Sequence, residues 1–440
     1  MMTDRSAPQL LGPWMTMALV VGGMIGAGIF MLPVSLAPLG VNAVFGWLIS
    51  SVGALALAYA FARLSRQDGL GIQAYIEREL GATVGFAVTW AFLISVWAGN
   101  AALSIATASA LARIMPALND PSRIAWAAIG LIAFLTMVNA MGAKASGRLA
   151  VLTVAIKILP LLAVVLILGQ RSASSQPFEA LGTVPISFDA IATGAALTLF
   201  ALTGFETATA PVGKVRDPAR TIFRAIMIGT TFVAVLYLLS STAVTLILPA
   251  SQIPGSVAPF ADAIGSAWGE GAALFAAFAI AVSAFGCLNG GVMIGGELGY
   301  SLALRGDIPR ALAVTQRGNT PVVAQVTASI IAILLVIANM SRDTAGLFTF
   351  VILLATSATL WLYLAGALAA LKQRPPAIAV LMILVGLIFT AFAFYGSGLE
   401  ANAWGVVLLA AGLAIRVVMR WLNSHGSIPA AGPAPAAPRE

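Results

Sequence analysis

The segment Gly22-Gly23-Met24-Ile25-Gly26-Ala27-Gly28-Ile29-Phe30 decides the fold of this chain, because its glycines interrupt an otherwise apolar helix. A second apolar stretch is interrupted in the same way at Thr203-Gly204-Phe205, and a proline follows each interruption, Pro33 and Pro211. Unwound backbone inside a membrane is tolerated only where it lines a cavity, and interrupted helices at matching places in two halves indicate a substrate site near the bilayer midplane. The pattern therefore predicts a secondary transporter.

The composition is that of a membrane protein. Apolar residues make up 60% of the 440 positions and charged residues 9%, with a mean hydropathy of +0.99, whereas soluble domains average about 25% charged residues. A helix of about 20 apolar residues crosses the hydrocarbon core, and we expect twelve, at 11–37, 41–62, 84–112, 124–141, 149–169, 189–212, 223–248, 271–303, 321–340, 344–371, 376–395 and 402–421. The expected fold class is an all-α membrane protein. The first run is too long for the core of a cleavable signal peptide.

Basic residues are distributed unequally between the two sides of this predicted bundle, and cytoplasmic segments normally carry more of them. With the N-terminus inside, eighteen fall on the cytoplasmic side, namely Arg5, Arg63, Arg66, Arg78, Lys144, Arg148, Lys214, Arg216, Arg220, Arg224, Arg305, Arg310, Arg317, Lys372, Arg374, Arg416, Arg420 and Arg439. Four fall outside, namely Arg113, Arg123, Arg171 and Arg342. The bias predicts cytoplasmic termini and accounts for the net charge of +7 without a nucleic-acid partner.

Cys287 and His425 are each the only residue of their type. A single cysteine excludes an intrachain disulfide and a cysteine-based zinc site. His425 lies in the predicted tail, which excludes histidine clusters for metals or proton relays within the membrane. We expect no cofactor, and any proton carrier in the membrane must be a carboxylate or a lysine.

The chain divides into a short N-terminus, one membrane domain and a tail. The interruptions predict two five-helix repeats, and an odd number of helices inverts the second repeat, so that spans 1 and 6 run antiparallel and their interruptions meet. Spans 11 and 12 lie outside the repeat and are available for packing or for contact with a second copy in a homodimer. The predicted boundaries are 1–10 for the N-terminus, 11–421 for the transporter domain, 11–169 and 189–371 for the repeats, 376–421 for the last helices and 422–440 for a disordered tail.

Polar connections on the cytoplasmic side complete this organisation. Ile72–Leu80 is expected to form an interfacial helix before span 3. The stretch Lys214–Arg224 contains the turn signal Asp217-Pro218 among four basic residues and is expected to be a loop. Residues 304–320 form a similar loop after span 8.

Four motifs in order resemble the amino acid/polyamine/organocation superfamily. They are the glycine-rich segment from Gly22 to Phe30 with Pro33, then Gly204-Phe205-Glu206, then Lys214-Val215-Arg216-Asp217-Pro218-Ala219-Arg220, and finally Arg305-Gly306-Asp307-Ile308-Pro309 with Thr320-Pro321. The resemblance extends from Leu11 to Trp421. Within the superfamily the chain is similar to the basic amino acid/polyamine antiporters of the arginine/agmatine type, which implies the five-plus-five inverted repeat with broken helices 1 and 6.

Backbone groups at the two interruptions predict a site for an α-amino acid. Exposed amides at Gly26, Ala27 and Gly28 offer hydrogen bonds and a positive dipole end to the substrate carboxylate, while carbonyls at the second interruption accept from its ammonium. The alternative is that the glycines only allow close helix packing. Further carbonyl or wall groups of this site are expected from Ile25, Phe200, Thr203 and Gly204.

Two ionisable residues are candidates for proton or cation coupling. Glu206 follows the second interruption, and a carboxylate inside a membrane is costly and functional by default; in the resembled antiporter the matching glutamate is proton-sensitive. Lys157 lies about 12 Å into span 5, and sodium-independent members of the resembled superfamily can carry a lysine there whose ammonium takes the place of a sodium ion. Glu206 could instead be structural, and Lys157 could snorkel to the interface.

Span 3 is expected to present a polar face to the cavity. Asn100, Trp97, Ser104 and Thr107 follow the i, i+3, i+4 and i+7 spacing of one helical face. In the resembled antiporter an asparagine at this position binds the distal guanidinium, and an aromatic matching Phe200 closes over the substrate. The alternatives are an interhelical hydrogen bond for Asn100 and core packing for Phe200.

The sequence departs from the resembled antiporter at several positions. Ala27 stands where that antiporter has a serine that bonds the carboxylate, and Gly291 stands where it has a tryptophan. A cationic head group therefore loses one cation–π surface. Glu297, farther along span 8, is expected to be a solvated vestibule charge rather than a gate residue.

These observations predict a multi-pass amino acid transporter of the inner (plasma) membrane that works by alternating access, an exchanger of the arginine/agmatine type. Asn100 and Phe200 favour a basic substrate, whereas Ala27 and Gly291 leave neutral amino acids as the alternative. An ion channel would need rings of charged or carbonyl groups along a pore, and an enzyme would need a clustered polar constellation; the sequence shows neither. The expected partners are an amino acid or polyamine and the lipid bilayer.

Overall fold

The computed structural model describes residues 13–64, 72–141, 144–175, 177–179, 181, 184–206, 218–315 and 320–425. The regular elements in these residues are helices, as the sequence predicts. The predicted N-terminus 1–10, Pro211, residues 214–217 and the end of the tail lie outside the described residues. The Lys214–Arg224 stretch is helical from Pro218 onward, as the first turns of α9, so the expected loop is wrong over that part. The main helices are α1 Pro13–Met24, α2 Gly28–Leu36, α3 Asn42–Leu64, α4 Ile72–Leu80, α5 Ala82–Ile114, α6 Pro121–Ala140, α7 Lys144–Ala173, α8 Phe188–Leu202, α9 Pro218–Ile247, α10 Pro259–Trp268, α11 Glu270–Leu304, the short η5 Arg310–Ala313, α12 Val322–Ala338, α13 Thr344–Lys372, α14 Ala377–Gly396 and α15 Gly398–His425.

Most of these helices are long and apolar enough to cross a membrane. Nine meet that test in the described residues, and the number is ten when the bent pair α1 and α2 is taken as one span. The helices α8 and α12 are apolar but shorter, with 15 and 17 residues. The first predicted run corresponds to the pair α1 and α2, and each of the other eleven overlaps one helix in the described residues. The count of twelve spans and their inverted repeat stay predictions.

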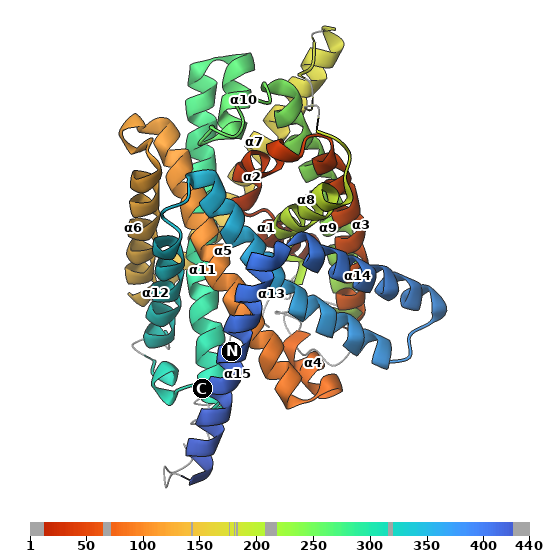
Figure 1. Ribbon diagram of the computed structural model, residues 1–440, viewed down its shortest axis with the longest axis vertical. Coiled ribbons are helices and arrows are strands. Elements are labelled where there is room, and N and C mark those ends of the chain that lie inside the picture. The colour runs from red at the N-terminus through yellow and green to blue at the C-terminus, as the bar shows by residue number, and fades with distance from the viewer. Residues whose placement is uncertain are drawn as a thin grey trace, which may run out of the picture.

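Figure 1 shows the helices packed around two central ones. The longest helices, α5 and α11, run side by side through the middle of the bundle, with α6 and α12 on one side and α3, α8 and α9 on the other. The pair α1 and α2 packs against α9 and α8. Helix α10 lies at one end of the molecule and α4 near the other; these ends are called the α10 end and the α4 end below.

Several helices begin at residues whose side chains cap them. Asp120, Ser187 and Asp343 each accept a hydrogen bond from the backbone N–H three residues ahead, at the starts of α6, α8 and α13. Such a side chain satisfies one of the amides that a helix leaves without a partner in its first turn. Pro121 then takes the first helical position of α6, where its missing N–H has no cost.

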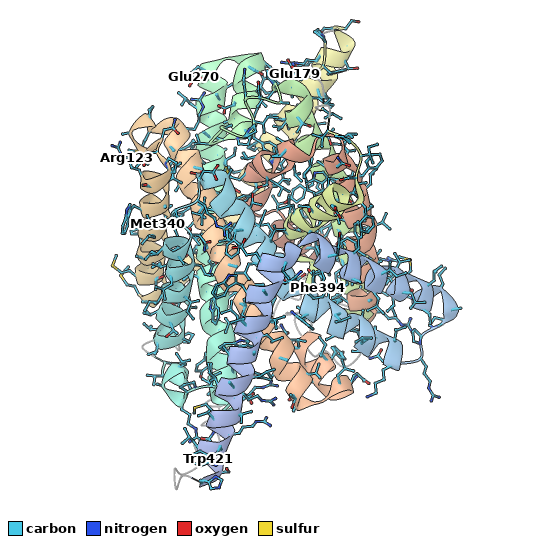
Figure 2. All side chains as sticks on the ribbon, in the orientation of Figure 1. Arg123, Glu179, Glu270, Met340, Phe394 and Trp421 are labelled. Atoms are coloured by element: carbon cyan, nitrogen blue, oxygen red, sulfur yellow. The ribbon has the colours of Figure 1, made fainter. Side chains whose placement is uncertain are left out.

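Ion pairs fasten the helix ends. Arg113, at the end of α5, binds Asp262 of α10 at 2.8 Å and Glu270 of α11 at 2.7 Å. Near the opposite end, Arg416 of α15 binds Asp307 at 2.8 Å. Figure 2 places the labelled Glu270 at the α10 end and Trp421 at the α4 end.

Two features of the fold differ from the sequence expectation. The interfacial helix at Ile72–Leu80 has the expected bounds, but α10 had not been predicted. Its ten residues are too few to span a membrane. The last helix continues past the expected boundary at residue 421 to His425, so the start of the tail is helical rather than disordered and His425 belongs to α15, where its ring stacks on Trp421.

Candidate functional site

The first interruption separates α1 from α2 and bends the chain by 43°. Helix α1 ends at Met24, and α2 begins at Gly28. Between them the amide of Gly26 folds back onto the carbonyl of Met24 at 2.7 Å. Ala27 occupies the N-cap position of α2 and makes no side-chain hydrogen bond. The N-cap residue therefore supplies no side-chain acceptor to the positive end of α2.

Side chains from two other helices bind the carbonyls that this interruption releases. Tyr237 of α9 donates its hydroxyl to the carbonyl of Met24 at 3.0 Å. The thiol of Cys287, on α11, lies 3.7 Å from the carbonyl of Ile25. Buried carbonyls without partners are costly, so these contacts stabilise the unwound segment.

Lys157 is buried inside the protein. Only 5% of its surface is exposed, and its Nζ donates to the carbonyl of Gly22, in the last turn of α1, at 3.3 Å. A cation at the negative end of a helix is electrostatically favourable. The structure therefore contradicts the snorkelling alternative for Lys157, because its ammonium is directed to α1 and not to the membrane surface.

The second interruption follows α8, which ends at Leu202. The hydroxyl of Thr203 donates to the carbonyl of Phe200 at 2.7 Å. Glu206 is 7% exposed, and its Oε2 accepts from the amide of Gly204 at 3.1 Å and from the hydroxyl of Tyr363, on α13, at 3.2 Å. The carboxyl thus joins the end of α8 to α13.

The two interruptions lie against each other. Gly204 has φ +110°, a conformation that side-chain-bearing residues rarely adopt, and a Cβ there would lie 2.6 Å from the carbonyl oxygen of Gly23. Glycine at this position is therefore required both by the backbone conformation and by the close approach of α1.

A cavity of about 630 Å³ lies beside both interruptions. Nine of the twelve candidate residues line it, namely Gly26, Gly28, Asn100, Lys157, Phe200, Thr203, Gly204, Glu206 and Gly291. Among the described residues that line this cavity, Lys157 is the basic residue and Glu206 is the acidic one. The cavity lining also includes Phe92 of α5 and Ile294 of α11, and Phe92 lies nearer than Asn100 to the start of α5, which directly follows α4. On the α10 side, Phe30 packs edge-on against Phe260 of α10, with ring centroids 5.3 Å apart.

Glycines in the wall make room for the larger candidate side chains. A Cβ on Gly28 would lie 2.5 Å from the ring of Phe200, and one on Gly291 would lie 1.9 Å from Oδ1 of Asn100. Asn100 is 2% exposed. A side chain at Gly291 would therefore require the amide of Asn100 to move from the position it has in this structure.

Three candidate residues do not line this cavity in the described structure. Ile25 and Ala27 are fully buried and take part through their backbone alone. Trp97 lines a separate cavity and packs edge-on against Trp90. The prediction that Trp97 and Asn100 share one cavity-facing side of the helix is therefore wrong. Three residues turn a helix by about 300°, so the two side chains point in directions about 60° apart.

The remaining residues of that predicted face also point elsewhere. Ser104 and Thr107 donate their hydroxyls to carbonyls of their own helix, at 2.8 and 2.7 Å. Neither lines the cavity, and neither does Glu297, which is exposed on α11.

Sequence reasoning missed Tyr237, Tyr363 and Cys287. All three side chains contact the interrupted segments, and Tyr237 and Cys287 also line the cavity. Buried tyrosines need a partner for their hydroxyl, so a tyrosine inside an apolar span was the signal available. The sequence offers no sign of which carbonyl each one binds.

Interrupted helices that meet at a cavity are typical of secondary transporters. The chain belongs to the amino acid permease family, whose model matches residues 11–423, and thus to the amino acid/polyamine/organocation superfamily. It is 30% identical over 354 residues to the cadaverine/lysine antiporter of Escherichia coli (strain K12), covering 78% of each chain. It is 27% identical over 411 residues to the putrescine transporter PotE of the same strain, covering 89% of this chain and 91% of the relative. The Haemophilus influenzae putrescine transporter PotE is likewise 27% identical, over 403 residues, covering 89% and 92%.

Proposed function

We propose that the chain is an antiporter that exchanges a cationic amino acid for a diamine or polyamine across the inner membrane by alternating access. The observation that carries this proposal is the 630 Å³ cavity, which joins the first residue of α2, Gly28, to the carboxyl of Glu206. The names of the relatives, a cadaverine/lysine antiporter and a putrescine transporter, support the substrate class.

A zwitterionic amino acid complements the two sides of this cavity. Its carboxylate would bind the amides at Gly26, Ala27 and Gly28, where the dipole of α2 is positive. Its α-ammonium would bind carbonyls near Thr203 at the end of α8, where the dipole is negative. A distal amine would reach Oδ1 of Asn100. A diamine has no carboxylate, so it would bind only the carbonyls near Thr203 and Oδ1 of Asn100. One cavity could therefore hold either substrate in turn.

The membrane topology of the proposed transporter follows the charge bias. We place the α4 end in the cytoplasm, with both termini, because most basic residues of the sequence fall on that side. The proposed fold has twelve spans in a five-plus-five inverted repeat with two peripheral helices. The cavity then faces inward, and the contact between Phe30 and Phe260 lies on the external side.

The identity of the amino acid is the finer part of the proposal. Lysine with cadaverine and putrescine are the first candidates, and arginine with agmatine belongs to the same chemical class. A neutral amino acid is the second candidate function, favoured by one observation: the ammonium of Lys157 already lies in the wall, where it would repel a second cation.

A thermal-shift screen tests the substrate class. Purified protein is heated with lysine, arginine, ornithine, agmatine, cadaverine or putrescine, and with alanine or leucine at equal ionic strength. A ligand at about 100 times its Kd stabilises the folded state by about 2.7 kcal/mol, so a bound substrate raises the melting temperature. We expect stabilisation by at least one basic compound; stabilisation by neutral amino acids alone would replace the proposal with the second candidate.

A further inference from the structure

A second cavity, of about 240 Å³, lies near the α4 end and apart from the candidate substrate site. Helices α5, α11, α12 and α15, the short η5 and the turn before it form its walls. Apart from the hydroxyl of Thr327 and the indole N–H groups of Trp90 and Trp97, its side chains are apolar. A polar substrate would lose hydration there without gaining partners, so the cavity suits a hydrocarbon chain.

This cavity reaches the outer surface of the bundle. Among its lining residues, Ile415 is 37% exposed, and Thr327 and Ile331 are half-buried. Their neighbours Val326 and Ile330 on α12 are exposed apolar side chains. In a bundle of membrane-spanning helices such a surface contacts lipid, so an acyl chain can enter from the bilayer.

One polar group of the wall lacks a partner. The indole N–H of Trp90 donates to the carbonyl of Leu408 at 2.9 Å. The Nε1 of Trp97 is buried and has no hydrogen-bond acceptor among the described residues. A buried donor without an acceptor is destabilising, and the apolar side chains around it cannot supply one.

Positive charge gathers at the end of the cavity. Arg310 follows the lining residue Pro309, is exposed, and forms no ion pair within the described residues. Arg420 is 56% exposed and lies 3.3 Å from the carboxylate of Asp307, the residue before the lining Ile308. Arginines between helix ends at the cytoplasmic side are typical binding groups for anionic lipid headgroups.

A buried ion pair keeps this end of the cavity in place. The carboxylate of Asp307 accepts from Nε of Arg416 at 2.8 Å, and both side chains are 5% exposed. Arg416 also donates to the carbonyl of Ala82 at 2.9 Å. Since Asp307 precedes Ile308 and Arg416 follows Ile415, both lining residues are held by the pair, and the cavity is preformed.

We infer that this cavity binds an acyl chain of a phospholipid with an anionic headgroup, and that Arg310 and Arg420 bind the headgroup. In the proposed topology the site lies in the cytoplasmic leaflet. The proposed lipid site is separate from the substrate cavity. Lipid binding can therefore be measured without a transport assay, and its failure would leave the proposed function untouched.

Native mass spectrometry tests the inference. Delipidated protein is incubated with equal amounts of phosphatidylglycerol and phosphatidylcholine carrying the same acyl chains, and bound lipids are counted. We expect one phosphatidylglycerol in preference to phosphatidylcholine. Thr327→Phe, which fills the cavity, abolishes this binding, whereas the matched Val326→Phe on the lipid-facing side retains it. Arg310→Ala with Arg420→Ala reduces the preference by about fivefold for each arginine, and Arg224→Ala, an exposed arginine of α9, leaves it unchanged.

Three results would overturn the inference. Equal binding of the two lipids would show that Arg310 and Arg420 do not select an anionic headgroup. Unchanged binding in Thr327→Phe would show that the lipid does not occupy this cavity. A change from dimer to monomer in Thr327→Phe, with no loss of lipid, assigns the surface to a second copy of the chain. The melting temperature of each variant, measured in the same detergent, separates loss of the site from loss of the fold.

Discussion

Three glycines in the cavity wall are subject to different constraints. Gly204 has a positive φ and touches the backbone of α1, so a side chain there would disturb the fold. A side chain at Gly291 would instead displace the amide of Asn100. A Cβ on Gly26, by contrast, has as its nearest neighbour the carbonyl oxygen of Met24, at 4.0 Å. A side chain at residue 26 can therefore fill the cavity without displacing its walls, which makes Gly26 the informative position for mutation.

The pH dependence of transport is predicted to reside in Glu206. In Glu206→Gln the amide oxygen can still accept from Gly204 and Tyr363, while the side chain stays neutral at every pH. We expect exchange to continue with a flattened profile between about pH 5 and 8, a range where a functional carboxyl changes charge when its environment is tuned. Glu297→Gln, at an exposed position, is the control and retains the wild-type profile. An unchanged profile in Glu206→Gln would remove this role.

Lys157 is predicted to make transport independent of sodium. Its ammonium binds the carbonyl of Gly22 at the end of α1, and Lys157→Met removes that cation. We expect substrate binding to persist, while exchange slows by about tenfold, since a loss of about 1.4 kcal/mol corresponds to that factor. Exchange with and without sodium, with Lys372→Met as the exposed control, checks this. A strict sodium requirement of the wild type would contradict it.

At the scale of the elements, the cavity brings the sole cysteine of the sequence to the place where helices meet. Cys287 of α11 lines it and contacts the carbonyl of Ile25. A substrate at about ten times its Kd should slow alkylation of this thiol by a maleimide about tenfold, because only the unoccupied fraction reacts. Cys287→Ser gives the background. Undiminished alkylation in the presence of a substrate known to bind would place the substrate elsewhere.

The ion pair between Asp307 and Arg416 is predicted to stabilise the packing of α15 against α5. In Arg416→Met the carboxylate stays buried without its main partner, which costs about 3–5 kcal/mol. The apparent melting temperature should fall by several degrees. Asp307→Asn in the same background should recover part of that loss, because it removes the unpaired charge. Arg420→Met removes a largely exposed partner of Asp307 and should cost at most about 1 kcal/mol of stability. An equal fall in melting temperature for Arg416→Met and Arg420→Met would contradict the stronger role given to Arg416.

The sequence predicted helical elements better than the directions of individual side chains. Apolar runs and glycines located the helices and the interruption before Gly28, because local composition determines them. Trp97 was misplaced, since spacing along a helix defines a broad face and only packing selects which part meets a cavity. The contacts of Tyr363 with Glu206 join spans far apart in sequence, and such contacts depend on tertiary structure.

At the scale of the molecule, the described structure has one candidate substrate cavity that reaches from the helix interruptions toward the α4 end. On the α10 side, α2 and α10 are joined by the edge-on packing of Phe30 and Phe260. Alternating access requires that this packing opens when the α4 side closes. Membership in the amino acid permease family supports such a cycle.

Counterflow in proteoliposomes tests the central claim most directly. Vesicles loaded with unlabelled lysine, arginine, cadaverine or putrescine are placed in a trace of the labelled compound. We predict accumulation of label by the wild type and by Gly130→Val, whose new side chain meets nothing within 4 Å on α6, and none by Gly26→Val, whose side chain fills the cavity. Accumulation by Gly26→Val at the wild-type rate, or no accumulation of any basic compound by the wild type, would contradict the proposed site and function.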